Sequence, residues 1–188
     1  MSATQITTSP TALLAGTYRL DPVHSSASFA VKHMVVATFR GRFEDFDATL
    51  TVDEAGNASL SGLVKVASIE LKDENLTAHV GSPDFFDLER YPEIRFEAAQ
   101  IEIADDGQVK IAGELTIKDQ THRVESTGTI AGPAVTLGDV TKLGLTLETV
   151  IDRTQYGLNW NAPLPKGGFA LANDVKLTVE LELAREEA

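Results

Sequence analysis

The sequence predicts an all-β protein built around one antiparallel sheet of about eight strands. Apolar and polar residues alternate with a period of two along most of the chain, which is typical of strands that bury one face and expose the other. Short links join most of these segments and no long helical crossover separates them, so neighbouring strands should run antiparallel. A sheet of this size with one apolar face must fold into a sandwich or close into a barrel.

Individual strands and turns can be assigned in order along the chain. The alternation is clearest in residues 27–35, 48–52, 60–66, 94–98, 109–117, 143–151 and 175–183. Turn-forming residues separate several of these segments, at 54–57, 105–107, 119–120 and 131–133. Small residues at inward positions either leave interior space or let neighbouring strands approach closely; they are Ala27, Ala48, Gly62, Ala98 and Gly113.

Two long excursions interrupt the strands, at residues 70–92 and 153–173. The first excursion contains a short helix over Asp73–Val80. Ser82-Pro83-Asp84 predicts the start of a second short helix, because a capping side chain precedes a proline at the first helical position. Tyr91-Pro92 would end that helix. Excursions of this length inside a compact domain often form the lid or mouth of a site.

The chain length favours a single domain with a short appendage. Residues 1–16 contain no Lys or Arg and only one brief apolar run, so they predict a flexible N-terminal arm rather than a secretory signal. Residues 17–188 then form the single domain. No stretch approaches the length of a membrane span, so we expect no stable membrane insertion and a cytoplasmic location.

Composition excludes several classes of protein. The 188 residues include no cysteine, which rules out disulfide scaffolds and cysteine-ligated metal centres. The formal net charge of −12 argues against binding to nucleic acid or to an anionic membrane surface. No phosphate-binding loop, nucleophile elbow or zinc-binding helix motif is present, so we expect neither catalytic residues nor a metal site.

Three histidines and one aromatic pair need an explanation. His33 lies on an apolar face, either as a core histidine held by hydrogen bonds or as a polar group inside a cavity. His79 either caps the local helix or faces the mouth of a pocket. His24 follows residues 21–23 and should stabilise a turn through hydrogen bonds. At least one ring of Phe85-Phe86 should plug the sheet or cover a cavity.

Four short motifs occur in order along the chain. They are residues 18–25 (YRLDPVHS) with Phe29, Val31 and His33 after them, residues 82–87 (SPDFFD), residues 113–117 (GELTI) and residues 153–158 (RTQYGL). Each motif alone is weak. Together they resemble the YceI-like, polyisoprenoid-binding family, and the resemblance runs from about residue 17 to residue 183.

The resemblance implies an extended, lipocalin-like barrel of eight antiparallel strands with one or two short helices. It also implies an internal pocket for an amphiphile with a long isoprenoid or acyl tail, of the polyprenyl or isoprenoid quinone type. The chain departs from the family around His79, where relatives often carry arginines and this chain has Leu76, Thr77 and Gly81. Lys118-Asp119 replaces a common His-Gly pair. These departures predict a less charged head group.

The chain is therefore expected to carry or sequester such a lipid without catalysing a reaction. We expect no cofactor apart from this bound isoprenoid or quinone lipid. The residues expected to contact the ligand are Phe29, Val31, His33, Phe43, His79, Phe85, Phe96, Leu115, Leu147, Arg153 and Trp160. His33, His79 and Arg153 are the candidates for the head group or the mouth.

Two other functions stay open at this point. One is an enzyme that acts on such a lipid through a histidine and a carboxylate. The other is a barrel filled by its own side chains that serves as a protein-interaction module. Strand edges or the 153–173 segment would then support a homodimer.

Overall fold

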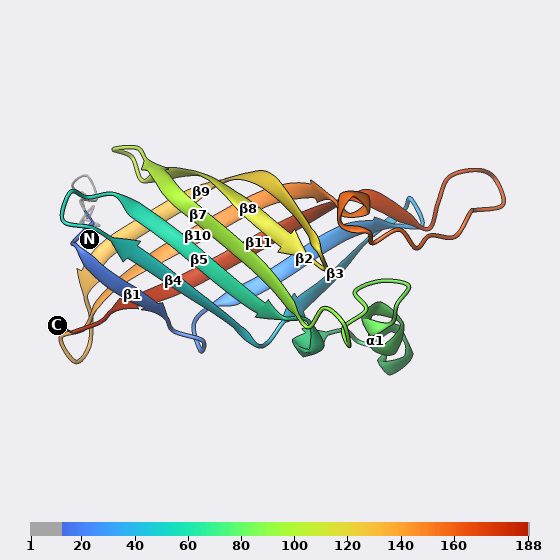
Figure 1. The fold of residues 1–188 in the computed structure, drawn as a ribbon, viewed down its shortest axis with the longest axis horizontal. Helices are drawn as coiled ribbons and strands as arrows, with labels where there is room; N and C mark the ends of the chain where they lie inside the picture. Colours follow the sequence, from blue (N-terminus) through green and yellow to red (C-terminus); the bar gives the residue numbers. More distant parts are fainter. Residues whose placement is uncertain (1–12, 188) are drawn as a thin grey trace, which may run out of the picture.

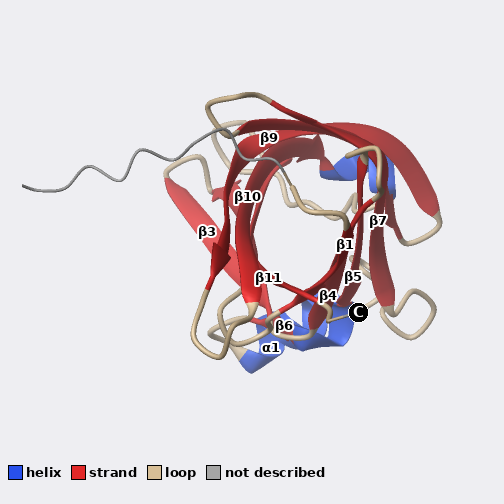
Figure 2. Cartoon of the chain, turned by 90° about the vertical axis from the view of Figure 1, so that its left-hand side faces the viewer, coloured by secondary structure: helices blue, strands red, loops and turns tan. Residues whose placement is uncertain are grey.

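The computed structural model describes residues 13–187, which form a closed barrel of eight antiparallel strands (Figures 1 and 2). The ring order is β1-β4-β5-β7-β8-β9-β10-β11, and β1 pairs again with β11 to close it. These strands are β1 (Gly16–Leu20), β4 (Phe46–Val52), β5 (Ala58–Lys65), β7 (Glu93–Ile103), β8 (Gln108–Ile117), β9 (Gln120–Val135), β10 (Thr141–Asp152) and β11 (Leu171–Arg185). The predicted fold class is confirmed.

Three further strands extend the wall at one end: β2 (Ser26–His33), β3 (Ala37–Phe43) and β6 (Ile69–Glu70). β2 continues β1 along the same edge of β11 and pairs with β3, which leads into β4. The sheet ends at β6, which pairs with two residues of β3. The short helices η1 (Val66–Ser68) and α1 (Glu74–Gly81) flank β6, and α1 lies at the end of the barrel opposite the start of β1 and the end of β11 (Figure 1).

All seven predicted strand segments are strands in the structure, with some differences at their ends. Val35 was expected on the apolar face but is 70% exposed, because the strand stops at His33 and residues 34–36 form a turn. The turn predicted at 131–133 is wrong, since these residues continue β9. Pro133 is tolerated there because β8 pairs only as far as Thr129, so this part of β9 has one free edge.

Helix α1 confirms the first predicted helix. The Asp73 side chain accepts a hydrogen bond from the backbone N–H of Leu76 at 2.8 Å, which caps the N-terminus. The second predicted helix, starting at Ser82, is wrong. The Phe86 N–H donates to the Val80 carbonyl at 3.1 Å, so residues 83–86 fold back as turns over the end of α1.

The end of the barrel that holds the termini is filled by side chains. Tyr18, Leu50 and Leu183 are completely buried in one apolar cluster with residues of β8 and β10. Leu13 packs against the same cluster, and the Tyr18 hydroxyl donates to the Leu14 carbonyl at 2.9 Å. The rest of the predicted N-terminal arm, residues 1–12, lies outside the described residues.

The small inward residues were expected either to leave interior space or to allow close approach of neighbouring groups, and Gly113 is a case of close approach. A Cβ atom at this position would lie 2.6 Å from the Phe96 ring and 2.7 Å from the Glu97 carbonyl oxygen. Gly113 therefore allows close approach of a neighbouring ring. By contrast, Ala27, Ala48 and Gly62 line open interior space.

Candidate functional site

A cavity of about 470 Å³ lies inside the barrel, between the filled end and the end that carries α1. Its wall is mainly apolar and comes from most strands, from α1 and from the residues before β11. All eleven site residues nominated from the sequence line it: Phe29, Val31, His33, Phe43, His79, Phe85, Phe96, Leu115, Leu147, Arg153 and Trp160. Their contact with a ligand stays a prediction.

Aromatic rings from the two long excursions meet at the cavity. Trp160, from the segment before β11, packs edge-on against His79 of α1 with 4.9 Å between ring centroids. Phe85 lies 5.2 Å from His79 and 5.4 Å from Trp160. Phe86 points elsewhere and meets Phe43 of β3 edge-on at 6.4 Å. The pair at 85–86 therefore connects the helix to both sides of the cavity wall.

Helix α1 turns one face toward the cavity. Leu76, His79 and Val80 line it at positions i, i+3 and i+4, the spacing of side chains on one helical face. Leu76 stands where relatives were expected to carry a charged residue, so this chain places an apolar group there. His79 lies in the last turn of α1 and lines the cavity, and its Nε2 lies 3.4 Å from the exposed Asp84 carboxylate.

Other polar residues also line the cavity, although polar atoms contribute little of its surface: Ser28, Asp47, Ser61, Arg95, Glu148 and Thr149. His33 is half-buried at the end of β2 and Ser126 of β9 is 6% exposed, and both line the cavity. Lys118 instead turns away, donating to the Phe85 carbonyl at 3.0 Å and lying over the Tyr91 ring. The lining is therefore mainly apolar, with polar side chains at separate positions.

Arg153 is the buried cation of the site, with 4% of its surface exposed. It begins the short helix η2 (Arg153–Tyr156). Its Nε donates to the Ala172 carbonyl at 2.9 Å, and its Nη1 donates to the carbonyls of Leu158 and Trp160. Burial lowers the pKa of this guanidinium. Arg153 therefore holds the segment that follows η2 (residues 158–170, here called the mouth segment) against β11.

The helix η2 also carries unused hydrogen-bonding capacity. Within residues 13–187, Arg153 Nη2 and the Tyr156 hydroxyl are buried without a hydrogen-bond partner. The Tyr156 ring packs edge-on against His122 at 5.0 Å, and burial raises the pKa of its hydroxyl. Buried polar groups without partners are uncommon. Of these two residues Arg153 lines the cavity, whereas Tyr156 packs behind the wall in the neighbouring apolar cluster.

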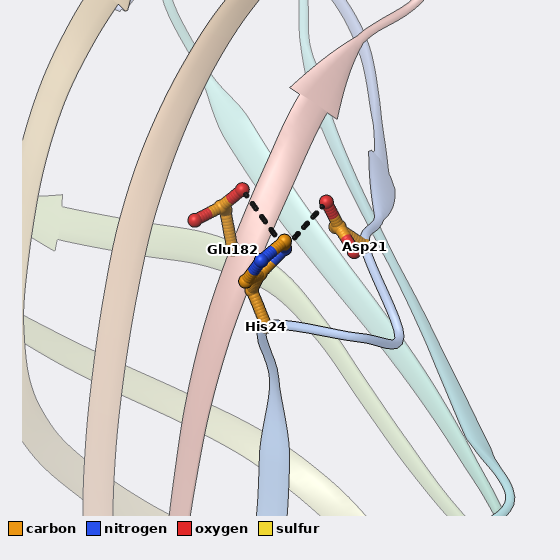
Figure 3. A group of neighbouring side chains, drawn as sticks. All are labelled: Asp21, His24 and Glu182. Carbon is orange, nitrogen blue, oxygen red and sulfur yellow. Dashed lines mark hydrogen bonds and ion pairs between the residues drawn. The ribbon is translucent and has the colours of Figure 1, made fainter.

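His24 is not among the residues that line the cavity and lies instead in an ion-pair cluster with Asp21 and Glu182 (Figure 3). Its Nδ1 is 3.1 Å from Asp21 Oδ2 and 3.7 Å from Glu182 Oε1. The Lys142 ammonium also reaches both carboxylates, at 2.9 and 2.6 Å. The hydrogen bonds from Lys142 and His24 hold the pKa of Asp21 well below its ordinary range. Because Lys142 already balances the carboxylates, this cluster has a structural role, as expected for His24.

Sequence reasoning missed three notable lining residues: Phe39, Ser126 and Met34. A signal for the first was present, since Phe39, Gly41 and Phe43 alternate with two arginines in β3. Ser126 and Met34 gave no comparable signal. Their positions depend on the pairing of β8 with β9 and on the turn after β2, which local sequence does not specify.

None of the helices among residues 13–187 is long and apolar enough to cross a membrane.

Comparison with known proteins finds relatives from bacteria. A UPF0312 protein of Staphylococcus aureus (strain N315) is 31% identical over 176 residues, which are 90% of this chain and 98% of that protein. Burkholderia cenocepacia BcnA has a similar solved structure, with a TM-score of 0.73, 25% identity, and coverage of 87% of this chain and 98% of that one.

Two further comparisons concern the fold and the family. A polyisoprenoid binding domain from Saccharophagus degradans shares the fold, with a TM-score of 0.65, 12% identity, and coverage of 90% of this chain and 98% of that one. The family model described as YceI-like domain matches residues 18–183. This match spans almost the whole barrel and contains all four motifs seen in the sequence, and the chain therefore belongs to the YceI-like domain family.

Proposed function

We propose that this protein binds an amphiphilic lipid with a long isoprenoid or acyl tail inside the barrel, and carries or sequesters it. The observation that carries the proposal is the cavity itself, which is about 470 Å³ in volume and bounded mainly by apolar side chains. Its size falls within the range of pockets that hold small molecules in proteins. A tail would lie between Phe29, Phe96 and Leu147, and a head group would lie toward His33, His79 and Arg153.

Hydrophobic transfer of the tail is the main favourable contribution to the binding of such a ligand. Each buried methylene contributes about 0.8 kcal/mol, so burial of ~10 methylenes contributes roughly 8 kcal/mol before ordering costs are subtracted. That free energy corresponds to a dissociation constant in the micromolar range. A mainly apolar cavity can therefore bind a tail without strong contacts to the head group.

An enzyme acting on a lipid is the competing proposal. Its support is the contact between His79 and Asp84 at the mouth, but Asp84 is 63% exposed in its side chain and the two groups are 3.4 Å apart. His79 also packs edge-on against the rings of Phe85 and Trp160, which suits a wall residue. The binding function is therefore the one that the geometry favours.

Trp160 provides the test, because it is the single tryptophan of the chain and lines the cavity. The protein, cleared of copurified lipid, is titrated with an isoprenoid quinone, a polyprenyl alcohol and a long-chain fatty acid while tryptophan fluorescence is recorded. The Saccharophagus degradans relative is named for polyisoprenoid binding, so the isoprenoids are tested first. A saturable change at one ligand per chain is expected. No saturable change with any of the three classes would contradict the proposal.

A further inference from the structure

Two neighbouring turns expose apolar side chains at the end of the barrel that carries the cavity mouth. Val35 and Val36, in the turn between β2 and β3, are 70% and 86% exposed. Phe169, in the loop before β11, is 61% exposed. A Cβ atom on Gly168 would lie 3.9 Å from Val35 Cγ2, so the two turns lie against each other. Together these apolar residues form what we call the mouth patch: Met34, Val35, Val36 and Phe169.

The first turn keeps its apolar residues in an unfavourable backbone conformation. Met34 and Val35 have φ angles of 50° and 66°. This left-handed region is rarely adopted by bulky residues and suits Asn or Gly. Folding stability would favour those residues here. A strained, solvent-exposed valine therefore indicates a role other than stability.

The mouth patch is continuous with the cavity wall. Met34 is 42% exposed to solvent and also lines the cavity. Its N–H donates to the Ala170 carbonyl at 2.7 Å, and Ala170 and Ala162 line the cavity below the second turn. Figure 1 shows both turns at the end of the molecule farthest from the start of β1 and the end of β11. An occupant of the patch would therefore sit directly over the cavity.

Cations flank the patch although the chain as a whole is acidic, with a formal net charge of −12. Lys32 and Arg40 lie on the strands that lead into the first turn, and Lys166 lies in the second; all three are exposed. Asp174, exposed near the start of β11, is the acidic residue close to them in sequence and register. Apolar anchors beside basic side chains are the combination that membrane surfaces bind.

We propose that the mouth patch docks the barrel on a lipid bilayer, so that lipid passes between membrane and cavity without crossing water. The passage of lipid rests on the proposed function, whereas the docking itself does not. Two protruding turns favour a bilayer as the occupant, because fluid lipid adapts to any shape while a stable protein interface needs a complementary surface.

Vesicle sedimentation tests the docking. The full chain is mixed with vesicles of phosphatidylcholine, alone or with phosphatidylglycerol, and compared with Val36→Asp and Phe169→Asp. Each substitution should weaken binding by about tenfold or more, since it replaces an inserted apolar group by a charge. Leu137→Asp is the matched control, because Leu137 is 97% exposed in the turn between β9 and β10, near the termini, and should bind like the parent.

Val35→Asn separates docking from folding. Asn relieves the backbone strain at φ 66°, so the variant should unfold at a higher temperature while binding vesicles less well. None of Val35, Val36 and Phe169 lines the cavity, so the Trp160 titration in solution should stay unchanged in all three variants.

The docking proposal would be overturned if the parent bound vesicles no better than the variants do, or did not bind vesicles at all. A parent that docks but fails the solution titration would overturn the lipid-binding function instead. Dimerisation of the parent that the aspartate variants abolish, without vesicle binding, would assign the patch to a second copy of the chain and contradict the bilayer.

Discussion

The guanidinium of Arg153 donates a hydrogen bond to the backbone carbonyl of Trp160 across 3.0 Å. The same side chain reaches the Ala172 carbonyl at the start of β11. One buried cation thus connects η2, the mouth segment and the last strand. Through Trp160 and its contact with His79, this connection extends to α1. The two long excursions are therefore held together over the cavity by side chains that are distant in sequence.

Arg153→Met should destabilise the fold by about 3 kcal/mol, because it leaves buried carbonyl oxygens without donors. The free energy of unfolding in urea measures this loss. Trp160 emission should also shift to longer wavelength as the mouth segment loosens. Arg90→Met is the control, since Arg90 is 71% exposed in its side chain and its ion pair with Asp87 is long, at 3.6 Å. An Arg153→Met variant as stable as this control would contradict the role assigned to Arg153.

Gly128→Ala should destabilise the barrel by about 3 kcal/mol or prevent folding, because the added methyl group has no room. Its Cβ atom would lie 1.7 Å from the Thr146 carbonyl oxygen of β10. Gly144→Ala tests the opposite case on the partner strand, where no atom lies within 4 Å of the new Cβ. Chemical denaturation of the two variants gives the comparison. Equal stability of the two would show that the register of β9 and β10 is wrong.

Phe96→Asp should abolish lipid binding, because it places a carboxylate on the cavity wall. Phe96 also packs against both apolar clusters, so circular dichroism must first establish that the variant is folded. Gln100→Asp, on the exposed face of the same strand, should bind ligand like the parent. The Trp160 titration reports both. Retention of full affinity by folded Phe96→Asp would refute the pocket assignment.

The cluster around Asp21 predicts a pH dependence of stability. Hydrogen bonds from Lys142 and His24 lower the pKa of Asp21 in the folded state, so the ionised carboxylate favours folding above its unfolded pKa of about 4. This contribution decreases as the pH falls below that value and is fully lost only below the lower pKa of the folded state. Asp21→Asn should therefore be less stable than the parent at pH 7, and the difference should shrink as the pH falls toward 2.

Urea midpoints across this pH range measure the difference. Asp105→Asn, in the exposed turn between β7 and β8, controls for the loss of one negative charge. A constant gap between parent and Asp21→Asn at every pH would contradict the ion-pair assignment.

Strand positions were predictable because each strand buries one face, and this burial produces an alternation of apolar and polar residues with a period of two. The prediction failed at two positions where the alternation or a turn-forming residue did not match the strand boundaries. Val35 continues the pattern of β2, but β2 ends at His33, which pairs with Ala37, so Val35 lies in the middle of the turn. Pro133 is typical of a turn, yet it lies within β9, at a point where the neighbouring strand β8 has already ended.

The cavity residues were predictable for the same reason, with help from the family motifs. Phe29, Phe96 and Leu147 lie on inward faces that alternation identifies, and all three line the cavity. The contacts that shape the mouth were not predictable. The pairing of Trp160 with His79, and of Arg153 with three carbonyls, depends on how two long excursions cross the end of the barrel. Local propensity does not encode such crossings.

Native mass spectrometry of protein purified without detergent, followed by organic extraction and lipid mass analysis, would decide whether the barrel carries a lipid. We expect a noncovalent species with a long isoprenoid or acyl tail, near one per chain, that is lost in folded Phe96→Asp and kept in Gln100→Asp. A parent that is empty as purified, and stays empty after incubation with quinones, polyprenyl lipids and fatty acids, would contradict lipid binding.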